Sequence, residues 1–557
     1  MPPSLRLPAR AALLRPSLPQ PGGAPSPPAA SRRPPEPPRP RGLAEMPGPS
    51  SPAFIFELLC RGGVRRLHEM QVLGRSRFGP LWKARFGPVL TVHVADPALV
   101  AQVLRQEGPE PRRALSCPWK EHRSLRGAPG GLLTLEGEAW RGSRRVLARG
   151  LLRPGAAEAF AGPVATVVAE LVARLQRLRR QHPRGVVPDI GTEFNRFGLE
   201  AISRVLFSSR LGCLGGPGAA PPAAEGVLHS VGTVLALTLV TMALPRPLLR
   251  LVPAPWDAFC RAWDQLFAFA KGHVDRRVAE VAARGAPAEG DTCVTDLLAR
   301  EHVPLSSIYG NVTELLLAGV DTVASTLAWS LYELARNPGV QAALHRELEA
   351  ATATRGDRDT RDRDTRDRDT SDRDTRDRDT SDNATRDSAT ATALRRLPLL
   401  RAVVKETLRL YPVIPGNARV IPDCDIRVGD YLVPRQTLIT LCHYATSRDS
   451  RFFPAPDSFH PERWLRRGDT GDTAGDTGDT AGDTGDTPGH PFASLPFGLG
   501  PRSCVGRRLA ELQLRMALAQ ILLRFEVRPE PGGGRVRPMT RTLLAPGTPI
   551  SLRFLER

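Results

Sequence analysis

One stretch near the C-terminal end decides the fold, and it reads Phe497-Gly498-Leu499-Gly500-Pro501-Arg502-Ser503-Cys504-Val505-Gly506. A single cysteine lies in a glycine-bounded loop, and a helical pattern begins directly after it, at Arg507. A cysteine thiolate is a strong, soft metal ligand, provided that it is kept deprotonated. The N–H groups and the positive dipole end of the following helix favour the thiolate, and we expect the charge of Arg502 to act in the same direction. Taken alone, such a cysteine is more often a small core residue than a ligand.

The full pattern, Phe-x-x-Gly-x-Arg-x-Cys-x-Gly, resembles the haem-binding loop of the cytochromes P-450, and every position of that signature is filled. The resemblance implies that Cys504 is the axial ligand of the iron in a haem b group, and that Phe497 and Arg502 belong to the same cofactor site. It also implies the family's fold, which is mainly α with a smaller β region: a helix-rich triangular prism that holds haem between a long central helix and the cysteine loop. Because a thiolate ligand favours cleavage of dioxygen, we expect a monooxygenase.

Charge and cysteine content limit which partners and which kind of fold are expected. The chain has 557 residues and a formal net charge of +19. A basic nucleic-acid-binding protein would fit this charge, but there is no aromatic-interleaved basic module and no zinc-ligand spacing, so we expect no nucleic acid as partner. An acidic protein or an anionic membrane surface explains the charge better. The eight cysteines are scattered without a Cys-x-x-Cys pair, which predicts no disulfide framework.

Residues 1–45 are rich in Pro, Ala, Ser and Arg, and five arginines precede the first acidic residue, Glu36. An Arg-rich, acid-poor leader without an apolar run of spanning length is typical of an organelle transit peptide; the alternative is a disordered basic tail. The mitochondrial branch of the P-450 family has such a leader, and the chain resembles this branch. We therefore expect a mitochondrial transit peptide and Pro-rich leader at 1–45, a catalytic domain at 46–557, and monotopic attachment to the matrix face of the inner membrane.

Candidate residues for the haem propionates lie far from the cysteine in the sequence. Trp140 and Arg144 are four residues apart and share one face of a predicted helix. An indole N–H and a guanidinium on one face can both donate to a carboxylate, and the pair resembles the family's propionate-holding Trp-x-x-x-Arg element. By itself the pattern also fits an exposed amphipathic helix. The resemblance implies a further propionate contact from Arg419.

A long apolar helix is predicted to be capped by Ser306 or Ser307 and to run past Ala335. At its centre Gly319, Asp321 and Thr322 conflict with a buried helix, because glycine costs about 1 kcal/mol relative to alanine and polar side chains compete for the backbone. Such conflicts are typical of functional sites. The cluster resembles the family's oxygen-binding segment, in which a local kink makes room for dioxygen. The resemblance implies that Thr322 stabilises the activated oxygen and that Asp321 relays protons; a capped break in a structural helix is the alternative.

Glu406 and Arg409 are neighbours at i, i+3 on another predicted helix and can pair. This spacing is common on protein surfaces and carries little information alone. The two residues match the family's Glu-x-x-Arg element, which Arg463 completes. The resemblance therefore implies a structural triad that supports the haem-side core.

Basic residues gather near the cysteine loop. Arg401 and Lys405 are four residues apart on one predicted helix, and Arg507 and Arg508 begin the helix after the cysteine. By the resemblance, this face binds an adrenodoxin-like [2Fe–2S] ferredoxin, which receives its electrons from an NADPH-dependent reductase. Docking that is steered by charge depends on ionic strength.

Several other segments carry structural predictions. Residues 81–94 predict two strands joined by a turn, and residues 106–131, rich in Pro and Gly, predict a mobile irregular lid over a pocket. Residues 227–244 predict a buried helix, and the basic-flanked loop that follows would, by the resemblance, dip into the membrane surface. Repeats at 356–390 and 468–487 cannot bury apolar surface, so both are predicted to be disordered inserts.

Longer runs at 310–322, 441–449 and 490–498 resemble the mitochondrial hydroxylases of sterols and secosteroids, so we expect a substrate of that class. The residues alone predict only an apolar pocket near Thr322, which by the resemblance borders the strand that holds Thr440. Two other classes stay open. One is a haem-thiolate isomerase, against which the intact oxygen-binding pair argues; the other is a haem-carrying binding or sensor protein without turnover.

Overall fold

The computed structural model describes residues 39–557 except 87–88, 114–117, 154, 217–220, 245–250, 285–292, 367–389 and 466–488. The chain divides into two compact units, Met1–Pro40 and Arg41–Arg557, and the account below concerns the second. Four sequence predictions fall wholly or mostly outside the described residues: the leader up to residue 38, the loop expected to dip into the membrane, the repeat at 356–390 beyond residue 366, and the repeat at 468–487.

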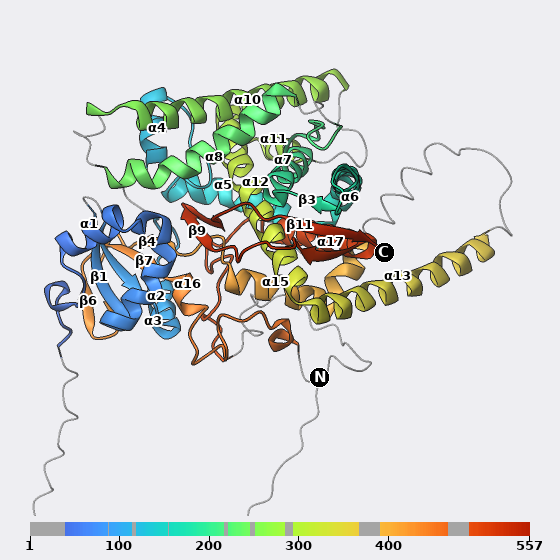
Figure 1. The fold of residues 1–557 in the computed structure, drawn as a ribbon. Coiled ribbons are helices and arrows are strands. Elements are labelled where there is room, and N and C mark those ends of the chain that lie inside the picture. The colour runs from blue at the N-terminus through green and yellow to red at the C-terminus, as the bar shows by residue number, and fades with distance from the viewer. Residues whose placement is uncertain are drawn as a thin grey trace, which may run out of the picture. The chain divides into compact units, whose positions relative to one another are not determined.

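Helices form most of the described part of Arg41–Arg557 (Figure 1). The α-helices are α1 (Ser51–Cys60), α2 (Leu67–Phe78), α3 (Pro97–Arg105), α4 (Pro118–Arg126), α5 (Gly137–Leu151), α6 (Ala161–Gln181), α7 (Ile190–Phe207), α8 (Pro222–Ala243), α10 (Ala254–Arg284), α11 (Val294–Arg300), α12 (Leu305–Arg336), α13 (Pro338–Arg366), α15 (Pro398–Leu410), α16 (His443–Thr446) and α17 (Arg507–Arg524). Short 3-10 helices are η1 (Leu43–Glu45), η2 (Gly63–Arg66), η3 (Glu158–Phe160) and η4 (Pro461–Trp464).

The described strands are short and form small sheets. They are β1 (Leu81–Phe86), β2 (Val89–Val94), β3 (Val186–Val187), β4 (Asn417–Val420), β5 (Ile426–Val428), β6 (Tyr431–Val433), β7 (Leu438–Leu441), β8 (Phe525–Pro529), β9 (Pro538–Arg541), β10 (Leu543–Pro546) and β11 (Leu552–Glu556). The largest sheet has the order β1-β2-β7-β4; β7 runs parallel to β2 and antiparallel to β4. A second has the order β3-β11-β8, and β5-β6 and β9-β10 are antiparallel pairs. The predicted helix-rich fold with a smaller β region is therefore confirmed.

The predicted strand pair at 81–94 is confirmed, with β1 and β2 antiparallel and Leu81 opposite Val94. Inward-facing apolar residues of this sheet, such as Val92 and Val94, form a core of their own with α3. That helix begins where the Asp96 carboxylate accepts hydrogen bonds from two amides of its first turn, which is the usual way to satisfy free N–H groups at a helix start.

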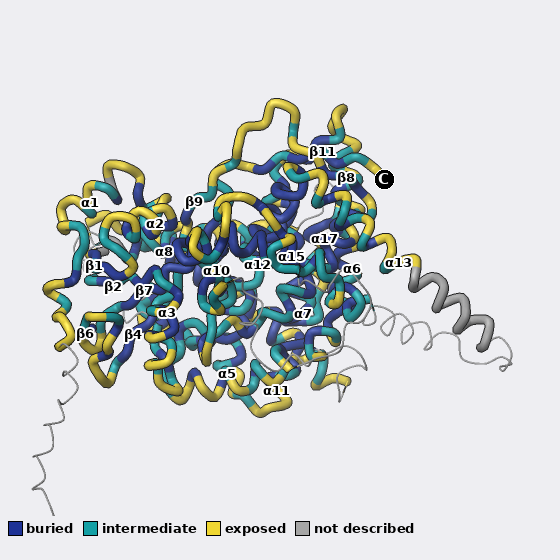
Figure 2. The backbone as a smooth tube through the Cα atoms, turned by 90° about the horizontal axis from the view of Figure 1, so that it is seen from below, coloured by how far each residue is buried: buried dark blue, intermediate teal, exposed yellow. Residues whose placement is uncertain are grey.

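The predicted long helix is α12, which is buried along most of its length and packs against α7, α10, α15 and α17 (Figure 2). Its contact with α7 depends on two glycines. A Cβ added to Gly319 would lie 2.6 Å from Ile202 Cγ1, and a Cβ added to Gly198 would lie 2.7 Å from the Val320 carbonyl oxygen. Gly319 therefore permits close helix packing, and α12 is helical without interruption from Leu305 to Arg336. The kink implied by the resemblance is not a break in this helix.

Two predictions of irregular structure are wrong in part. The segment 106–131 contains a regular helix, α4, whose side chains find partners on α10. Trp119 packs against Trp263, and His122 and Arg126 contact Asp264. The first repeat begins at residue 356, but the backbone of α13 remains helical to Arg366. A helix that is already nucleated extends at small cost, so a packed beginning carries it into the repeat.

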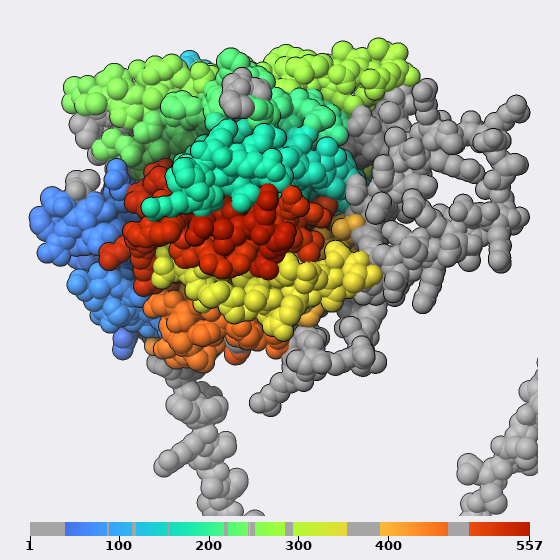
Figure 3. All heavy atoms as spheres, turned by 45° about the vertical axis from the view of Figure 1, so that its right-hand side comes forward, coloured from blue at the N-terminus to red at the C-terminus, as the bar shows by residue number. Residues whose placement is uncertain are grey.

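Segments far apart in the sequence share one face of the molecule. Figure 3 shows α6 in teal, α17 with the C-terminal strands in red, and α13 in yellow, lying next to one another.

α8 and α12 are each long and apolar enough to cross a membrane by length and composition alone. For α12 the core position explains this composition, because 67% of its most apolar window is buried inside the chain.

Candidate haem site

The cysteine loop is a tight turn that ends at the start of α17. The Cys504 amide donates to the Phe497 carbonyl at 2.9 Å, which closes the loop across the signature. Gly500 has a φ of +80°, and a Cβ there would lie 2.5 Å from Glu107 Oε1. Both the conformation and the close carboxylate explain why only glycine fits at this position.

The Cys504 side chain is exposed at its surface, although many protein atoms lie around it. Burial raises the pKa of the Cys504 thiol. The rise is opposed by the Gly506 amide and by the positive charges of three arginines, Arg144, Arg113 and Arg507. Because a metal ion deprotonates a coordinating thiol, this environment supports a thiolate ligand once iron is bound.

Arg502 does not act on the thiol in the expected way. Its guanidinium lies 3.9 Å above the Trp140 ring and donates hydrogen bonds to the carbonyl oxygens of Pro111 at 2.8 Å, Leu132 at 3.2 Å and Leu135 at 3.0 Å. Burial, together with neighbouring arginines, lowers the pKa of Arg502 to about 9. The sequence predicted a charge that favours the thiolate, whereas the structure has a buried anchor for the segment around residues 111–135.

The predicted pair on α5 reaches the cysteine loop. Trp140 is 2% exposed and stacks under Arg502, and Arg144 Nη2 donates to Ser503 Oγ at 3.3 Å. An exposed amphipathic helix is therefore excluded for this face. The negative charge of a Cys504 thiolate would raise the pKa of Arg144, but burial of Arg144 lowers that pKa by more.

Arg419 lies at the same site but already has a carboxylate partner. Its Nε donates to Glu107 Oε2 at 2.5 Å, and both side chains are almost fully buried. Sequence analysis missed Glu107, and it also missed Arg113, whose Nη2 donates to the Arg502 carbonyl oxygen at 3.4 Å. Both missed residues belong to the segment after α3, where no periodicity or motif sets them apart from other charged residues.

The cluster of buried arginines fits an anionic cofactor. Burial and the charge of Arg419 lower the pKa of Arg113 to about 10, and burial also lowers the pKa of Arg144. Positive charges that are desolvated and close to one another are stabilised by negative charge. The two propionates of a haem would supply it, next to a cysteine that can ligate its iron.

The two predicted oxygen-site residues lie side by side on α12, with different environments. Burial raises the pKa of Asp321 from 3.8 to about 6, and the positive charge of Arg541, at the end of β9, opposes the rise. The Thr322 hydroxyl donates to the Ala318 carbonyl oxygen at 2.7 Å. A carboxyl group with a pKa near 6 can take up and release protons near neutral pH.

The predicted triad has the expected geometry. Arg409 donates two hydrogen bonds to the Glu406 carboxylate, at 2.9 and 2.8 Å, and both side chains are fully buried. Arg463 Nε adds a third at 3.2 Å and Trp464 Nε1 a fourth at 2.8 Å, both from η4. Burial raises the pKa of Glu406, but the hydrogen bonds and charge of Arg409 hold it below its ordinary value. The triad joins α15 to the segment before the second repeat.

The basic residues predicted to bind a ferredoxin belong to α15 and α17, which contact each other. The Arg507 guanidinium pairs with Glu511 at 3.1 Å and lies over the Phe497 ring. Arg401 is close enough to the buried Arg515 to lower its pKa, and Lys405 Nζ is 5.8 Å from the centre of the Trp464 ring. Positive charge at the start of α17 therefore lies beside the cysteine loop, and positive charge on α15 lies near α17.

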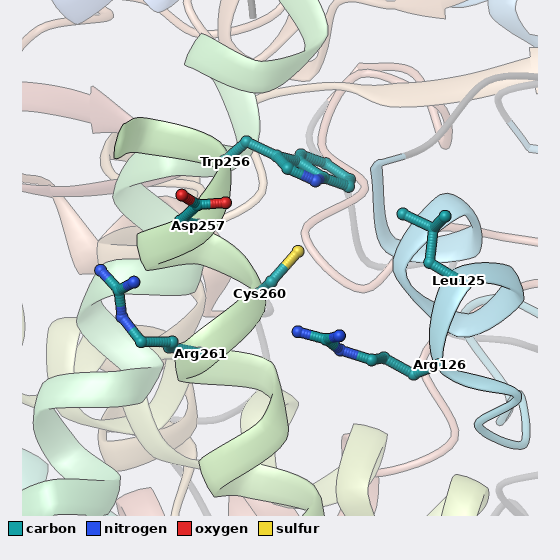
Figure 4. A pocket seen from close by; sticks show the side chains of 6 residues that line it. All are labelled: Leu125, Arg126, Trp256, Asp257, Cys260 and Arg261. Atoms are coloured by element: carbon teal, nitrogen blue, oxygen red, sulfur yellow. The ribbon is translucent and has the colours of Figure 1, made fainter. Parts of the chain in front are cut away.

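The residue predicted to border the substrate and the described pocket lie in different places. Thr440 lies in β7 between Ala418 of β4 and His93 of β2, and it is half-buried. A separate pocket of about 320 Å³ lies between α4 and α10, lined by Leu125, Arg126, Trp256, Asp257, Cys260 and Arg261. Figure 4 shows Arg126 and Cys260 pointing toward each other across it. None of the predicted haem residues lines this pocket.

Known proteins are similar in sequence to this chain over nearly its whole length. The chain matches the family Cytochrome P450 over residues 46–368 and 375–554. It belongs to the cytochrome P450 family. Membership makes it a haem-dependent monooxygenase that needs an electron-transfer partner.

The relatives of this P450 refine the resemblance. It is 52% identical over 524 residues, 93% of either chain, to the human 25-hydroxyvitamin D-1 alpha hydroxylase, mitochondrial, and 50% identical over 527 residues to the mouse protein of the same name. It is 35% identical to the rat Sterol 26-hydroxylase, mitochondrial, over 93% of this chain. The runs quoted above predicted a 25-hydroxyvitamin D 1-alpha-hydroxylase as the most similar type, with sterol 27- and vitamin D 24-hydroxylases as alternatives. The higher identity to the first type confirms that prediction of resemblance.

Proposed function

We propose that this P450 hydroxylates 25-hydroxyvitamin D at the 1-alpha position, which makes calcitriol. The observation that carries the proposal is 52% identity over 93% of the chain to the human enzyme with that name, against 35% to the sterol 26-hydroxylase. The cofactor is haem b, held by Cys504 and, at its propionates, by Trp140, Arg144 and Arg419, with Phe497 and Arg502 in the loop that surrounds it. Arg113, which sequence analysis missed, joins this set.

When bound, a haem with a thiolate ligand supplies the oxidising chemistry that inserts one atom of dioxygen into a C–H bond and releases the other as water. The protein's own residues do the remaining work. Asp321 holds a proton at a pKa of about 6 and passes it on. The Thr322 hydroxyl, which donates to the Ala318 carbonyl oxygen at 2.7 Å, would stabilise oxygen at the site. Thr440 borders the substrate.

Electrons come from an adrenodoxin-like [2Fe–2S] ferredoxin that docks on Arg401, Lys405, Arg507 and Arg508 and is reduced by an NADPH-dependent reductase. The proposal is supported by Arg507 beside the cysteine loop and by the contact between α17 and α15, which carries Arg401 and Lys405, since an acidic carrier is steered by positive charge. We further propose that residues 1–45 are a transit peptide and leader, that 46–557 are the catalytic domain, and that the mature protein is attached peripherally to the matrix face of the inner mitochondrial membrane.

The test is reconstitution of the purified protein with ferredoxin, reductase, NADPH and 25-hydroxyvitamin D, with the product identified by mass spectrometry and NMR. We expect a 1-alpha hydroxyl group, and we expect none when ferredoxin is omitted. Hydroxylation on the side chain instead would point to the sterol or 24-hydroxylase type, and an isomerised product without added oxygen would point to an isomerase.

A further inference from the structure

A short segment between α4 and α5 connects the central helix to the cysteine loop. We call residues 130–135 the bridging segment. Its backbone lies directly on α12: a Cβ added to Gly131 would lie 2.4 Å from the Gly310 carbonyl oxygen, and one added to Gly310 would lie 2.2 Å from the Gly130 carbonyl oxygen. Such an approach excludes any side chain at these positions, so the contact is specific to glycine.

One turn further along α12, the bridging segment is fixed by the Glu314 carboxylate. Glu314 is 1% exposed. Its Oε2 accepts hydrogen bonds from the amides of Leu133 at 2.6 Å and Thr134 at 3.3 Å, and its Oε1 accepts one from Thr134 Oγ1 at 2.5 Å. Hydrogen bonds to an ionised carboxylate are stronger than those between neutral groups.

The same carboxylate is linked to α4. Arg123 Nη2 lies 3.5 Å from Glu314 Oε1, and the side chains of this ion pair are 6% and 0% exposed. The Arg123 guanidinium is held over the Trp263 ring of α10, at 3.9 Å from its centre. Glu314 therefore collects contacts from the bridging segment and from α4, which is itself packed on α10.

The other side of the bridging segment belongs to the cysteine loop. Arg502, two residues before Cys504, donates to the carbonyl oxygens of Leu132 and Leu135, the residues on either side of the two amides that bind Glu314. The bridging segment is thus hydrogen-bonded to a carboxylate of α12, Glu314, and to a guanidinium of the cysteine loop, Arg502.

We propose that Glu314 is a positioning residue, which acts through the bridging segment and Arg502 to fix the cysteine loop relative to the α12 wall that carries Thr322. It touches neither substrate nor cofactor in this role. The inference rests on the haem site and not on the proposed substrate.

The test is Glu314→Gln in the full haem-loaded protein, with Glu333→Gln as the matched control. Glu333 is also a buried carboxylate on α12, but it accepts from the Tyr411 hydroxyl at 2.5 Å and from Asn337 Nδ2 at 3.4 Å, and not from the bridging segment. We expect Glu314→Gln to speed hydrogen exchange at the Leu133 and Thr134 amides by roughly tenfold to a hundredfold, since hydrogen bonds to a charge are lost. We also expect it to lower the share of reduced protein whose carbon monoxide spectrum shows thiolate ligation, and Glu333→Gln to do neither.

Equal effects of the two variants, or a Glu314→Gln protein with wild-type exchange and spectrum, would overturn the proposal. If Glu314→Gln does not fold, the same two measurements on Thr134→Val and Thr134→Ser test the proposal instead. Only the serine keeps the hydroxyl that donates to Glu314, so it should restore slow exchange and the thiolate spectrum, and failure of that rescue would also overturn the proposal. No readout uses the secosteroid, so a wrong substrate assignment leaves the result unchanged.

Discussion

At Asp321, burial raises a carboxyl pKa from 3.8 to about 6 in spite of the positive charge of Arg541. The folded protein therefore keeps this proton between about pH 4 and pH 6, where the unfolded chain has released it. The unfolded state binds fewer protons in that window, so the free energy of unfolding falls as the pH rises through it. One pKa unit corresponds to about 1.4 kcal/mol, so the fall is up to about 3 kcal/mol.

Asp321→Asn should consequently be more stable than wild type at pH 7, by up to about 3 kcal/mol, because the amide is never ionised. The gain should vanish near pH 3, where wild type is protonated in both states. Turnover should fall by about a hundredfold, since the proton relay is lost. Urea unfolding at the two pH values and a product assay check these outcomes. A stability difference that is the same at both pH values would contradict the assigned pKa.

At the scale of elements, the contact between α7 and α12 makes a prediction about Gly319. Alanine is the better helix former by about 1 kcal/mol, but its Cβ would meet Ile202 at 2.6 Å. Overpacking of a core costs about 1–3 kcal/mol, so Gly319→Ala should destabilise the protein, and Ile202→Ala in the same chain should relieve the clash. Gly232→Ala on α8 is the control, because nothing lies within 4 Å of its Cβ, and it should stabilise. Thermal unfolding of these three variants and wild type measures the differences in stability. A destabilised Gly232→Ala or a stabilised Gly319→Ala would argue against this packing.

The triad that joins α15 to η4 makes a second prediction at this scale. Arg409→Ala removes two hydrogen bonds and the buried positive charge that pairs with the Glu406 carboxylate, which costs about 3–5 kcal/mol. Arg463→Ala removes the longer hydrogen bond to Glu406, at 3.2 Å, and one to the Pro454 carbonyl oxygen, at 3.0 Å, from a side chain that is 11% exposed. Its cost should be about 1–2 kcal/mol. Denaturant midpoints of the two variants measure the difference. Equal midpoints would mean that the buried pair does not dominate the junction.

At the scale of the whole molecule, the basic face on α15 and α17 should govern the rate of electron delivery. Arg401→Glu and Arg508→Glu should each raise the KM for ferredoxin by about tenfold at low salt, because steering by charge is lost. The difference from wild type should shrink as salt shortens the Debye length below about 10 Å. Arg61→Glu, at the end of α1 and 65% exposed, is the control and should change nothing. Reduction kinetics that ignore ionic strength would contradict the assignment.

Sequence patterns predicted the arrangement of two side chains correctly where both residues lie in the same helix. The spacing of Trp140 and Arg144, and of Glu406 and Arg409, fixes which side chains share a helix face, and the structure has both pairs so arranged. Arg502 illustrates the limit. Its place in the motif predicted a charge for the thiolate, but its hydrogen bonds go to backbone carbonyls more than 360 residues earlier in the chain, and no local pattern encodes such a contact.

The same reason explains the missed residues. Arg113 and Glu107 lie in an irregular segment, and Glu314 looks like any polar residue in a helix until its partners, about 180 residues away, are known. Gly319 was attributed to an oxygen site by its motif, whereas its close contact is with a neighbouring helix. Tertiary packing decides each of these cases, and packing is the part of the fold that a single sequence conveys least.

The central claim is that Cys504 ligates the haem iron, and the carbon monoxide difference spectrum of the reduced protein tests it most directly. Wild type and Cys60→Ser, which changes an exposed cysteine on α1, should both show the band of a thiolate-ligated haem. Cys504→Ser should lose that band and all hydroxylation. A Cys504→Ser protein with an unchanged spectrum would contradict the account.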